Sequence, residues 1–356
     1  MSGTSLDGID VALIKTDGNN VVHRGPSRSY AFEADQRGML RDAIELAKTL
    51  CDRHARPGEL AAIEWALTEW HVAAVQSFCR ECGLTDSEID LIGFHGQTVI
   101  HRPEKHLTVQ LGDGPLLARR LNKPLIYDLR AADVAAGGEG APLVPAYHRA
   151  LAGSLKERPV AFVNIGGVAN VTWIGGDDEL LAFDTGPGNA LLDDWAKKHT
   201  GQSSDRDGRL ALAGRADEKT VAQFLDNEFF EQRPPKSLDR NSFSGLPVEG
   251  LNPQDGAATL VEVTAAAIAL GANWFPQSAK AWIICGGGRR NPAIMQALSR
   301  RLPRVRSAEE MALDGDAVEA EAWAYLAVRS REGLPITYPQ TTGVPIPMTG
   351  GILALP

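Results

Sequence analysis

A glycine-rich turn that leads into a β-branched strand occurs twice in this sequence, about half a chain apart, and this repeat constrains the fold more than any other feature. The first copy reads MSGTSLDGIDVALI over residues 1–14, and the second reads NIGGVANVTWI over residues 164–174. Two such copies predict a duplicated, two-lobed fold. A strand over residues 159–163 leads into the second turn, whereas almost nothing precedes the first. We therefore expect an opening strand of about five to eight residues upstream of Met1.

Apolar strand-like runs alternate with helix-length segments, which predicts an α/β fold with a largely buried sheet. The chain has 356 residues, 44% of them hydrophobic, which is enough for a sizeable core and favours two domains. The strand candidates are residues 11–16, 90–94, 125–128, 160–165, 171–174, 180–183 and 282–285, and the helix candidates are residues 59–82, 187–199, 259–274, 292–301 and 317–330. The proline-rich tail over residues 335–356 predicts an irregular strap on the surface.

Charge and cysteine content limit the partners and the compartment. A formal net charge of -9 repels polyanions, so nucleic acid and acidic membranes are poor partners. Cys51, Cys79, Cys82 and Cys285 are too few for a disulfide framework, and we interpret the CxxC pair as core residues rather than zinc or redox ligands. The first residues do not resemble a signal peptide, and the most apolar stretch, residues 263–275, is too short to span a bilayer. The expected location is the cytoplasm.

Three glycine-rich turns, at residues 3–8, 166–167 and 286–288, each adjoin a predicted strand. Glycine lets backbone N–H groups approach phosphate oxygens closely, so an acidic chain can bind a polyanion without a basic patch. The sequence contains neither a P-loop pattern nor a dinucleotide-binding glycine pattern after a strand. Each turn alone also fits an ordinary tight turn of an α/β sheet.

The first turn carries hydroxyls on Thr4 and Ser5 and carboxylates on Asp7 and Asp10. These carboxylates are suited to holding Mg²⁺ through water beside phosphates. Turn-forming residues at a hairpin tip are the alternative, although turn chemistry needs only one Asp and one Gly.

Asp184 follows an apolar strand and precedes a helix predicted to begin near Pro187. A carboxylate there can accept a proton from water or a hydroxyl, while the amides of Gly186 and Gly188 point toward a ligand. The alternative is that Asp184 only closes a turn or caps the helix. Lys236 and Arg240, in the segment PPKSLDRNSF, form either a cationic lid or a solvated loop.

Further polar candidates stand beside predicted strands and loops. His95 and Gln97, in the segment HGQT, suit hydrogen bonds to sugar hydroxyls, although a single His is more often structural. Arg130 precedes a glycine-rich segment, residues 133–145, that we predict to be an ordered loop, and it can grip a carboxylate or form a salt bridge between domains. Glu319 fits the third helical position of a capping box that starts at Asp316.

These motifs together closely resemble those of the 1,6-anhydro-N-acetylmuramic acid kinase family. They are MSGTSLDGID, HGQT, RAADVAAGGEGAPLVP, NIGGVANV, FDTGPGNALLDDW, SDRDG, PPKSLDRNSF, CGGG and the helix of Glu319, in order from Met1 to about Leu326. The resemblance implies a duplicated ribonuclease-H-like fold of the actin/Hsp70/hexokinase-like superfamily, with mixed central sheets and ATP in an interlobe cleft. Residues 1–135 would form lobe I and residues 136–356 lobe II, with the C-terminal helix packing back on lobe I.

The resemblance also implies the site. The residues expected to bind ATP are Gly3, Thr4, Ser5, Leu6, Asp7, Gly8, Ile9 and Asp10 in the first turn, Gly166, Gly167, Asn170, Gly186 and Gly188 around the second, and Gly286, Gly287, Gly288 and Asn291 around the third. Those expected to bind the sugar are His95, Gln97, Thr98, Arg130, Asp133 and Glu319, with Arg130 on the lactyl carboxylate. Mg²⁺ would bind Asp7 through water.

The activity that the resemblance implies joins hydrolysis to phosphorylation, with Asp184 as the base. Asp184 would activate a water that attacks the anomeric carbon, which opens the 1,6 bridge and frees O6 for the γ-phosphoryl group. The product would be N-acetylmuramic acid 6-phosphate, formed in peptidoglycan recycling. The expected partner is a small amino sugar, and a homodimer is an assembly that the sequence leaves open.

Three other interpretations compete with this one. A kinase for another sugar would share the ATP site without needing the water. A nucleotide-gated binding protein of the actin or Hsp70 type would bind ATP without sugar-stimulated turnover. A glycoside hydrolase would use Asp184 and a second acid without ATP, and the three glycine turns speak against it.

Overall fold

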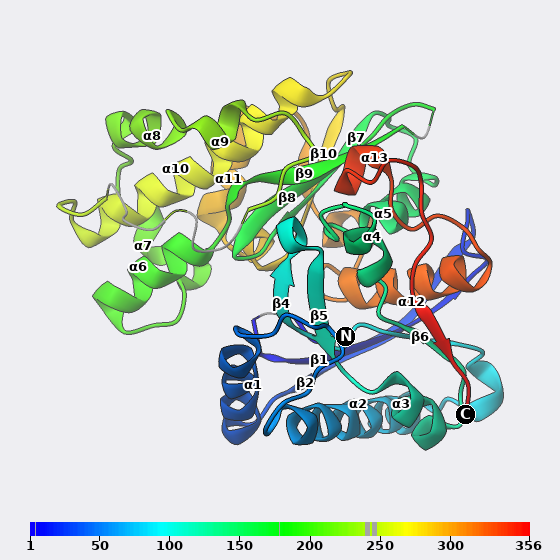
Figure 1. Cartoon of the computed structure of the whole chain (residues 1–356). Helices are drawn as coiled ribbons and strands as arrows, with labels where there is room; N and C mark the ends of the chain where they lie inside the picture. Colours follow the sequence, from blue (N-terminus) through cyan, green and yellow to red (C-terminus); the bar gives the residue numbers. More distant parts are fainter. Residues whose placement is uncertain (4, 178, 239–242, 244–247) are drawn as a thin grey trace. The chain divides into compact units, whose positions relative to one another are not determined.

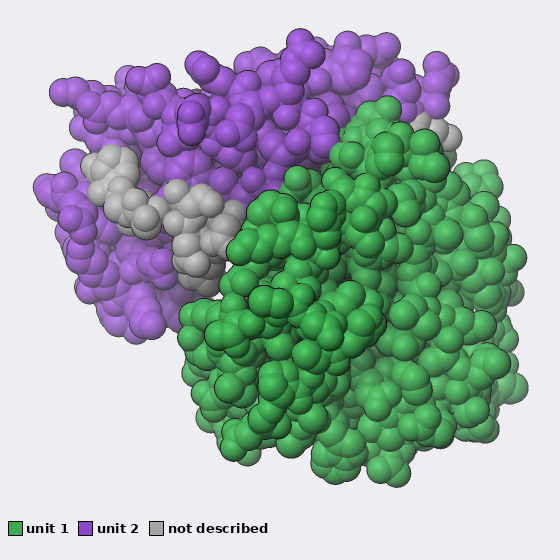
Figure 2. Space-filling view, viewed as in Figure 1, with its two compact units in different colours: residues 1–153, 317–356 green, residues 154–316 purple. Residues whose placement is uncertain are grey.

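The computed structural model describes residues 1–3, 5–177, 179–238, 243 and 248–356. Its chain divides into two units (Figure 2). Unit 1 consists of Met1–Gly153 and Ala317–Pro356, and unit 2 consists of Ser154–Asp316. The division differs from the sequence-based boundary after residue 135, because helix α5 (Pro145–Ala152) packs against helix α12 (Val318–Arg331) within unit 1.

Unit 2 is built on one mixed sheet of five strands. They are β7 (Val160–Ile165), β8 (Val168–Ile174), β9 (Leu180–Pro187), β10 (Ala281–Cys285) and β11 (Val305–Ser307), in the order β11-β10-β7-β8-β9. Strand β8 is antiparallel to β7 and β9, whereas β10 is parallel to both β7 and β11. This antiparallel meander continued by parallel strands is the ribonuclease-H-like order that the resemblance implies, and it confirms an α/β fold with a mixed sheet.

Helix α10 (Pro253–Gly271) is the central helix of unit 2 and packs along β8 and β9 (Figure 1). The other helices of this unit are α6 (Ala190–Thr200), α7 (Arg209–Leu212), α8 (Glu218–Leu225), α9 (Glu228–Glu231) and α11 (Pro292–Arg301), each in contact with α10. The segment Pro253–Trp274 is long and apolar enough to cross a membrane, but 67% of its most apolar window is buried in the protein. It therefore has the burial of a core helix.

The core of unit 2 lies between the sheet and these helices. Its largest fully buried side chains include Trp173, Phe183 and Trp282. Burying a side chain such as Phe183 stabilises the fold by about 1.5–3 kcal/mol, so the sheet that carries the glycine turns is held firmly.

The described sheets of unit 1 have two or three strands each, fewer than the sheet of unit 2. Strands β1 (Gly8–Thr16) and β2 (Val22–Ala31) form one antiparallel hairpin, and β4 (Gln97–Arg102) and β5 (Leu107–Leu111) form another. A third sheet has the order β12-β6-β3, from β3 (Ile92–Phe94), β6 (Leu125–Tyr127) and β12 (Ile352–Ala354), in which β3 is parallel and β12 antiparallel to β6. The prediction that the tail is an irregular strap is thus wrong for residues 352–354, because the backbone of β12 pairs with that of β6.

Helices α2 (Leu60–Cys82) and α12 support these sheets. Helix α2 packs on β1, β2 and α3, and α12 packs on β1, β3 and β6. The remaining helices of unit 1 are α1 (Ala34–Ala47), α3 (Gly114–Leu121), α4 (Ala131–Ala135) and α13 (Pro339–Thr342). A cavity of about 100 Å³ is bordered by residues of β1, β3, α2 and α12.

The sequence located long and strongly apolar elements well. The strand at residues 160–165 and the helix at residues 292–301 are confirmed at both ends, and the helix predicted at residues 59–82 is α2. Strand β1 starts three positions before the predicted strand. All four cysteines are free: Cys285 is buried, Cys79 and Cys82 are half-buried, and Cys51 is exposed.

Candidate active site

In unit 2, the predicted residues gather at one edge of the sheet. Strands β7, β9 and β10 run in the same direction, so their carboxyl ends share that edge. The second glycine turn follows β7, the third follows β10, and β9 leads into α6. Ligands of α/β proteins bind at the carboxyl ends of such strands, and this edge is therefore the candidate site in unit 2.

The second glycine turn is bonded to the amino-terminal end of α6. The Asn189 N–H donates to the Gly166 carbonyl at 2.7 Å, and the Gly188 N–H donates to the Gly167 carbonyl at 2.9 Å. A Cβ atom on Gly188 would lie 2.2 Å from the Gly166 carbonyl oxygen, so only glycine permits this close approach. The Gly188 amide, which the sequence assigned to a ligand, is thus used to hold the turn.

The third glycine turn packs on β7 through two of its three glycines. A Cβ atom on Gly286, where φ is +71°, would lie 2.3 Å from Asn164 Oδ1, and one on Gly288 would lie 2.4 Å from Ile165 Cγ2. At Gly287 the nearest atom is 3.5 Å away. Gly287 is therefore the position with open space beside its backbone.

Arg289 and Asn291 follow this turn, and both side chains are bonded to other residues of the protein. Arg289 donates to the Gly286 carbonyl at 2.9 Å and pairs with Glu309 at 2.7 Å, which fixes the turn from outside. Asn291 is the N-cap of α11, where its Oδ1 accepts from the Ala293 N–H at 2.9 Å. The side chain of Asn291 therefore has a structural role, and its contact with a cofactor stays a prediction.

Asp184 lies within β9, paired with Asn170 of β8 beside an irregularity in the register. Its Oδ2 accepts from the Leu238 N–H at 2.8 Å, and its own N–H donates to the Lys236 carbonyl at 3.0 Å. Since α6 begins at Ala190 rather than near residue 187, Asp184 does not cap this helix. The half-buried carboxylate is held by a backbone donor from a separate segment, as a positioned base requires.

Lys236 is buried beside this carboxylate. Its Nζ donates to the Phe229 carbonyl at 2.7 Å and lies 4.3 Å from the centre of the Phe229 ring. Burial lowers the pKa of Lys236 to about 8, although the charge of Asp184 favours the protonated form. Lys236 is therefore a fixed cation near Asp184, whereas the residues from 239 to 242 lie outside the described part of the chain.

In unit 1, the first glycine turn leads into β1. Leu6 has a φ of +57°, and a Cβ atom on Gly8 would lie 2.4 Å from the Tyr30 carbonyl oxygen. The exposed Asp7 accepts a hydrogen bond from Ser5 Oγ at 2.5 Å, so its carboxylate lies at the surface, where water-mediated Mg²⁺ binding needs it. Asp10 lies in the strand and accepts from Ser29 Oγ at 2.5 Å. Thr4 is outside the described residues.

The HGQT segment reaches the first glycine turn. His95 Nδ1 donates to the Ser2 carbonyl at 2.8 Å, and Gln97 Nε2 donates to the Gly3 carbonyl at 3.1 Å. Thr98, the next residue of β4, accepts from Gln110 Nε2 at 3.3 Å. Of the expected sugar ligands, Gln97 therefore contacts the backbone of the predicted phosphate turn, and His95 contacts the residue directly before it.

Arg130 is close to this segment and is held on several sides. Its guanidinium donates to the Gly140 carbonyl at 2.7 Å and lies 5.1 Å from the centre of the Trp323 ring. Burial lowers the pKa of Arg130 to about 10, and the charges of Glu319 and Asp133 oppose this shift. Arg130 thus stays charged at neutral pH, with acidic groups nearby.

Asp133 is 2% exposed, and both of its carboxylate oxygens accept hydrogen bonds from the protein. Oδ1 accepts from the Gly140 N–H and Oδ2 from Thr342 Oγ1, each at 2.6 Å. Asp133 therefore organises the glycine-rich loop against α13. The prediction that this segment is entirely a loop is wrong at its start, because α4 includes Asp133.

The capping box expected around Glu319 does not form. Helix α12 has Ala317 as its N-cap, with no side-chain cap among the described residues, and Asp316 instead accepts from Arg289 Nη1 at 2.9 Å. Trp323 was not among the predicted site residues, and its ring packs against His95 at a centroid distance of 4.6 Å. Its spacing of four from Glu319 on one helix is the signal that could have found it.

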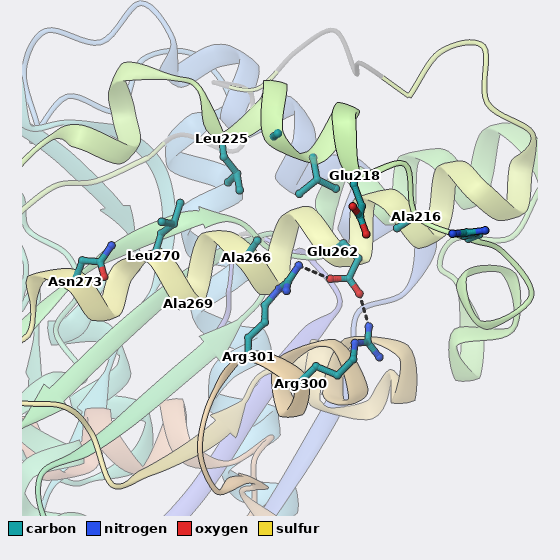
Figure 3. A pocket seen from close by; sticks show the side chains of 13 residues that line it. Ala216, Glu218, Leu225, Glu262, Ala266, Ala269, Leu270, Asn273, Arg300 and Arg301 are labelled. Carbon is teal, nitrogen blue, oxygen red and sulfur yellow. Dashed lines mark hydrogen bonds and ion pairs between the residues drawn. The ribbon is translucent and has the colours of Figure 1, made fainter.

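A cavity of about 900 Å³ lies elsewhere in unit 2, along α8, α10 and the end of α11. Figure 3 shows Glu262 between two arginines, and it pairs with Arg300 and, at 2.7 Å, with Arg301. None of the predicted site residues lines this cavity. Within the described parts of the chain, no cluster of three or more metal-ligating side chains occurs.

Comparison with known proteins agrees with the motif series. The family model for anhydro-N-acetylmuramic acid kinase matches residues 1–354. Kinases of this description from Nitrobacter winogradskyi and Bradyrhizobium diazoefficiens are each 52% identical, over 100% of this chain and 98% of the relative. A ROK-family glucokinase from Streptomyces griseus, solved with glucose and AMPPNP, has a TM-score of 0.42 at 13% identity, over 93% of this chain and 98% of the glucokinase.

The full-length match places the chain among the sugar kinases. It belongs to the anhydro-N-acetylmuramic acid kinase family.

Proposed function

We propose that this chain is an ATP-dependent phosphotransferase that opens 1,6-anhydro-N-acetylmuramic acid by hydrolysis and phosphorylates its O6. The observation that carries this proposal is the family match over residues 1–354, together with relatives of that name at 52% identity. The product is N-acetylmuramic acid 6-phosphate, and the reaction serves peptidoglycan recycling.

Asp184 acts as the base in this proposal. It accepts a proton from a water that attacks the anomeric carbon, the bond from that carbon to O6 breaks, and O6 takes the γ-phosphoryl group. The support is the hydrogen bond from the Leu238 N–H at 2.8 Å, which orients one carboxylate oxygen. Lys236, 9% exposed, supplies a buried positive charge beside that base.

The glycine turns take the nucleotide. The open space beside Gly3, Gly166 and Gly287, where an added Cβ atom would meet nothing nearer than 3.5 Å, fits the approach of phosphate oxygens to a backbone. Mg²⁺, when bound, neutralises charge on the phosphates, and the exposed carboxylate of Asp7 is the residue that would hold it through water.

Arg130 and Glu319 are the proposed sugar ligands in unit 1. A guanidinium can grip a carboxylate in a bidentate fashion, which fits the lactyl group, and packing against Trp323 at 5.1 Å limits the rotamers of Arg130. Asp133 supports the site indirectly, since both of its oxygens are bonded to the chain. We propose that the enzyme works in the cytoplasm, either as a monomer or as a homodimer, without nucleic acid or membrane partners.

The decisive experiment compares wild type with Asp184→Asn. ADP release is measured with Mg-ATP and either 1,6-anhydro-N-acetylmuramic acid or glucose, and nucleotide affinity is measured by calorimetry. Loss of an essential base is expected to lower kcat by about 10²–10⁴-fold, while nucleotide affinity is unchanged. Asp193→Asn, in the first turn of α6, is the matched control. Turnover on glucose alone would instead indicate a kinase for another sugar.

A further inference from the structure

His95 is almost fully buried, at 6% exposure, and its two ring nitrogens face two different parts of the predicted site. Nδ1 lies 2.8 Å from the Ser2 carbonyl oxygen, at the start of the first glycine turn. Nε2 lies 3.3 Å from one guanidinium nitrogen of Arg130 and 3.4 Å from another. A single imidazole therefore connects the predicted phosphate turn with the predicted sugar ligand.

The partners fix the protonation state of this ring. The Ser2 carbonyl can only accept a hydrogen bond, so Nδ1 carries the proton. Arg130 can only donate, so Nε2 carries the lone pair. Burial, assisted by the charge of Arg130, lowers the pKa of His95 well below its usual range, which keeps the ring neutral. The connection is consequently complete at physiological pH.

The neighbours of His95 hold the same turn at two more points. Ser2 Oγ donates to the Gly96 carbonyl at 3.0 Å. Gln97, which is 0% exposed, donates from Nε2 to the Gly3 carbonyl, and this carbonyl also accepts from the Leu6 N–H at 3.2 Å. Gln97 thus reaches the carbonyl that closes the turn, and the HGQT segment fixes the backbone where the chain enters it.

The ring is in turn clamped by its surroundings. It meets Trp323 edge-on at 4.6 Å, and the same tryptophan lies under the Arg130 guanidinium at 5.1 Å. Gly96, with a φ of +70°, has room for no side chain, because a Cβ atom would lie 2.3 Å from the Leu111 carbonyl oxygen. His95 therefore has little freedom to move independently of Arg130.

We propose that His95 is a positioning residue that couples Arg130 to the first glycine turn, and that Gln97 is a second positioning residue for the same turn. This rests on the proposed function, because it takes the turn as a phosphate site and Arg130 as a sugar ligand. The interpretation of His95 and Gln97 as direct sugar ligands is thereby replaced. The predicted nucleotide turn and the predicted sugar ligand are then positioned by the two ends of one hydrogen-bonded side chain.

Two substitutions of His95 separate its two contacts. The amide nitrogen of His95→Asn lies near the position of Nδ1 and can still donate to Ser2, but the shorter side chain cannot reach Arg130. The longer amide of His95→Gln lies near the position of Nε2 and can accept from Arg130, but it leaves the Ser2 carbonyl without this donor. Gln97→Met removes the bond to Gly3, together with a longer bond of 3.4 Å to the Thr98 carbonyl, at nearly constant volume.

The measurements are the Kd of the Mg-ATP analogue by calorimetry, the KM of the anhydro sugar, and the melting temperature. Losing one such hydrogen bond is expected to weaken binding by about five- to tenfold. His95→Gln and Gln97→Met should raise the nucleotide Kd by this factor and leave the sugar KM unchanged, whereas His95→Asn should raise the sugar KM and leave the nucleotide Kd unchanged. A merely structural role would lower the melting temperature in all three variants without this split.

The outcomes distinguish the proposal from the function on which it rests. If the wild type binds the nucleotide, but His95→Asn and His95→Gln have the same nucleotide Kd and the same sugar KM, the positioning role of His95 is refuted and the proposed function is not. A rise in sugar KM in every variant, with the nucleotide Kd constant, restores His95 and Gln97 as sugar ligands. A wild-type protein that binds no nucleotide refutes the coupling and the kinase together.

Discussion

Acidification from about pH 7 to about pH 5 is expected to destabilise unit 1, because imidazoles are buried there in neutral form, among them those of His71 and His148. His71 of α2 lies edge-on to Phe94 at a ring distance of 5.0 Å, and its Nδ1 donates to the Leu67 carbonyl at 2.9 Å. His148 of α5 is 3% exposed. Burial lowers the pKa of each ring to about 3.

The sign and the size follow from the proton balance. An unfolded His has a pKa of about 6.5, so below this pH the unfolded chain binds a proton that the folded chain does not. The contribution of these neutral rings to the free energy of unfolding is therefore fully present above about pH 6.5. It is lost as the pH falls toward their pKa in the folded protein, about 3. At about pH 5 the difference is about 1.5 pH units, or about 2 kcal/mol per ring at 1.36 kcal/mol per unit. Both rings together give about 4 kcal/mol, a large part of a typical stability of about 5–15 kcal/mol.

Urea unfolding followed by tryptophan fluorescence at these two pH values measures this loss. His71→Leu should remove about 2 kcal/mol of the pH-dependent change, whatever its effect at neutral pH. His54→Gln, at an exposed position, is the control that changes the same residue type without removing a buried ring. If the wild type and His71→Leu lose equal stability between the two pH values, burial does not keep His71 neutral and the reasoning is refuted.

A further prediction concerns the third glycine turn. Gly288→Ala should lower the melting temperature and weaken nucleotide binding, because its Cβ atom would lie 2.4 Å from Ile165. Gly287→Ala, whose Cβ atom would lie 3.5 Å from the nearest atom, should keep the wild-type melting temperature. A calorimetric scan of both variants measures this difference, and equal melting temperatures of the two variants would contradict it.

The sequence predicted most of unit 2 and less of unit 1, for a physical reason. The strand at residues 160–165 is buried on both faces, so it reads as a continuous apolar run that cannot be mistaken for a loop. Strand β2 is half-exposed and contains Gly25 and Pro26, and β12 has only three residues. Strand β2 therefore lacks a clear apolar pattern. The pairing of β12 is decided by β6, which lies far away in the sequence, and no local pattern encodes such a choice.

Prediction of the site fails for a different reason. The sequence identifies groups that can bind a ligand, but it does not show which of them are already hydrogen-bonded to other parts of the protein. Asp133, Gly188 and Asn291 stand in glycine-rich or strand-end segments, where ligand contacts are frequent. In the structure, the oxygens of Asp133, the amide of Gly188 and the Oδ1 of Asn291 are all bonded within the protein. Spacing along the chain does not reveal these partners, because each one belongs to the three-dimensional surroundings.

His95 shows how this limit changes a functional assignment. From the sequence, a histidine at a strand end is either a sugar ligand or a structural residue, and the two interpretations exclude each other. The fold allows a third, because one ring nitrogen faces Ser2 and the other faces Arg130. The two nitrogens of a neutral imidazole differ in kind, one a donor and the other an acceptor, so the ring joins a carbonyl to a guanidinium without changing its charge. The Ser2 carbonyl needs a donor and the Arg130 guanidinium needs an acceptor. No other common side chain offers one donor and one acceptor on a rigid ring, so these two partners explain why a histidine stands at this position.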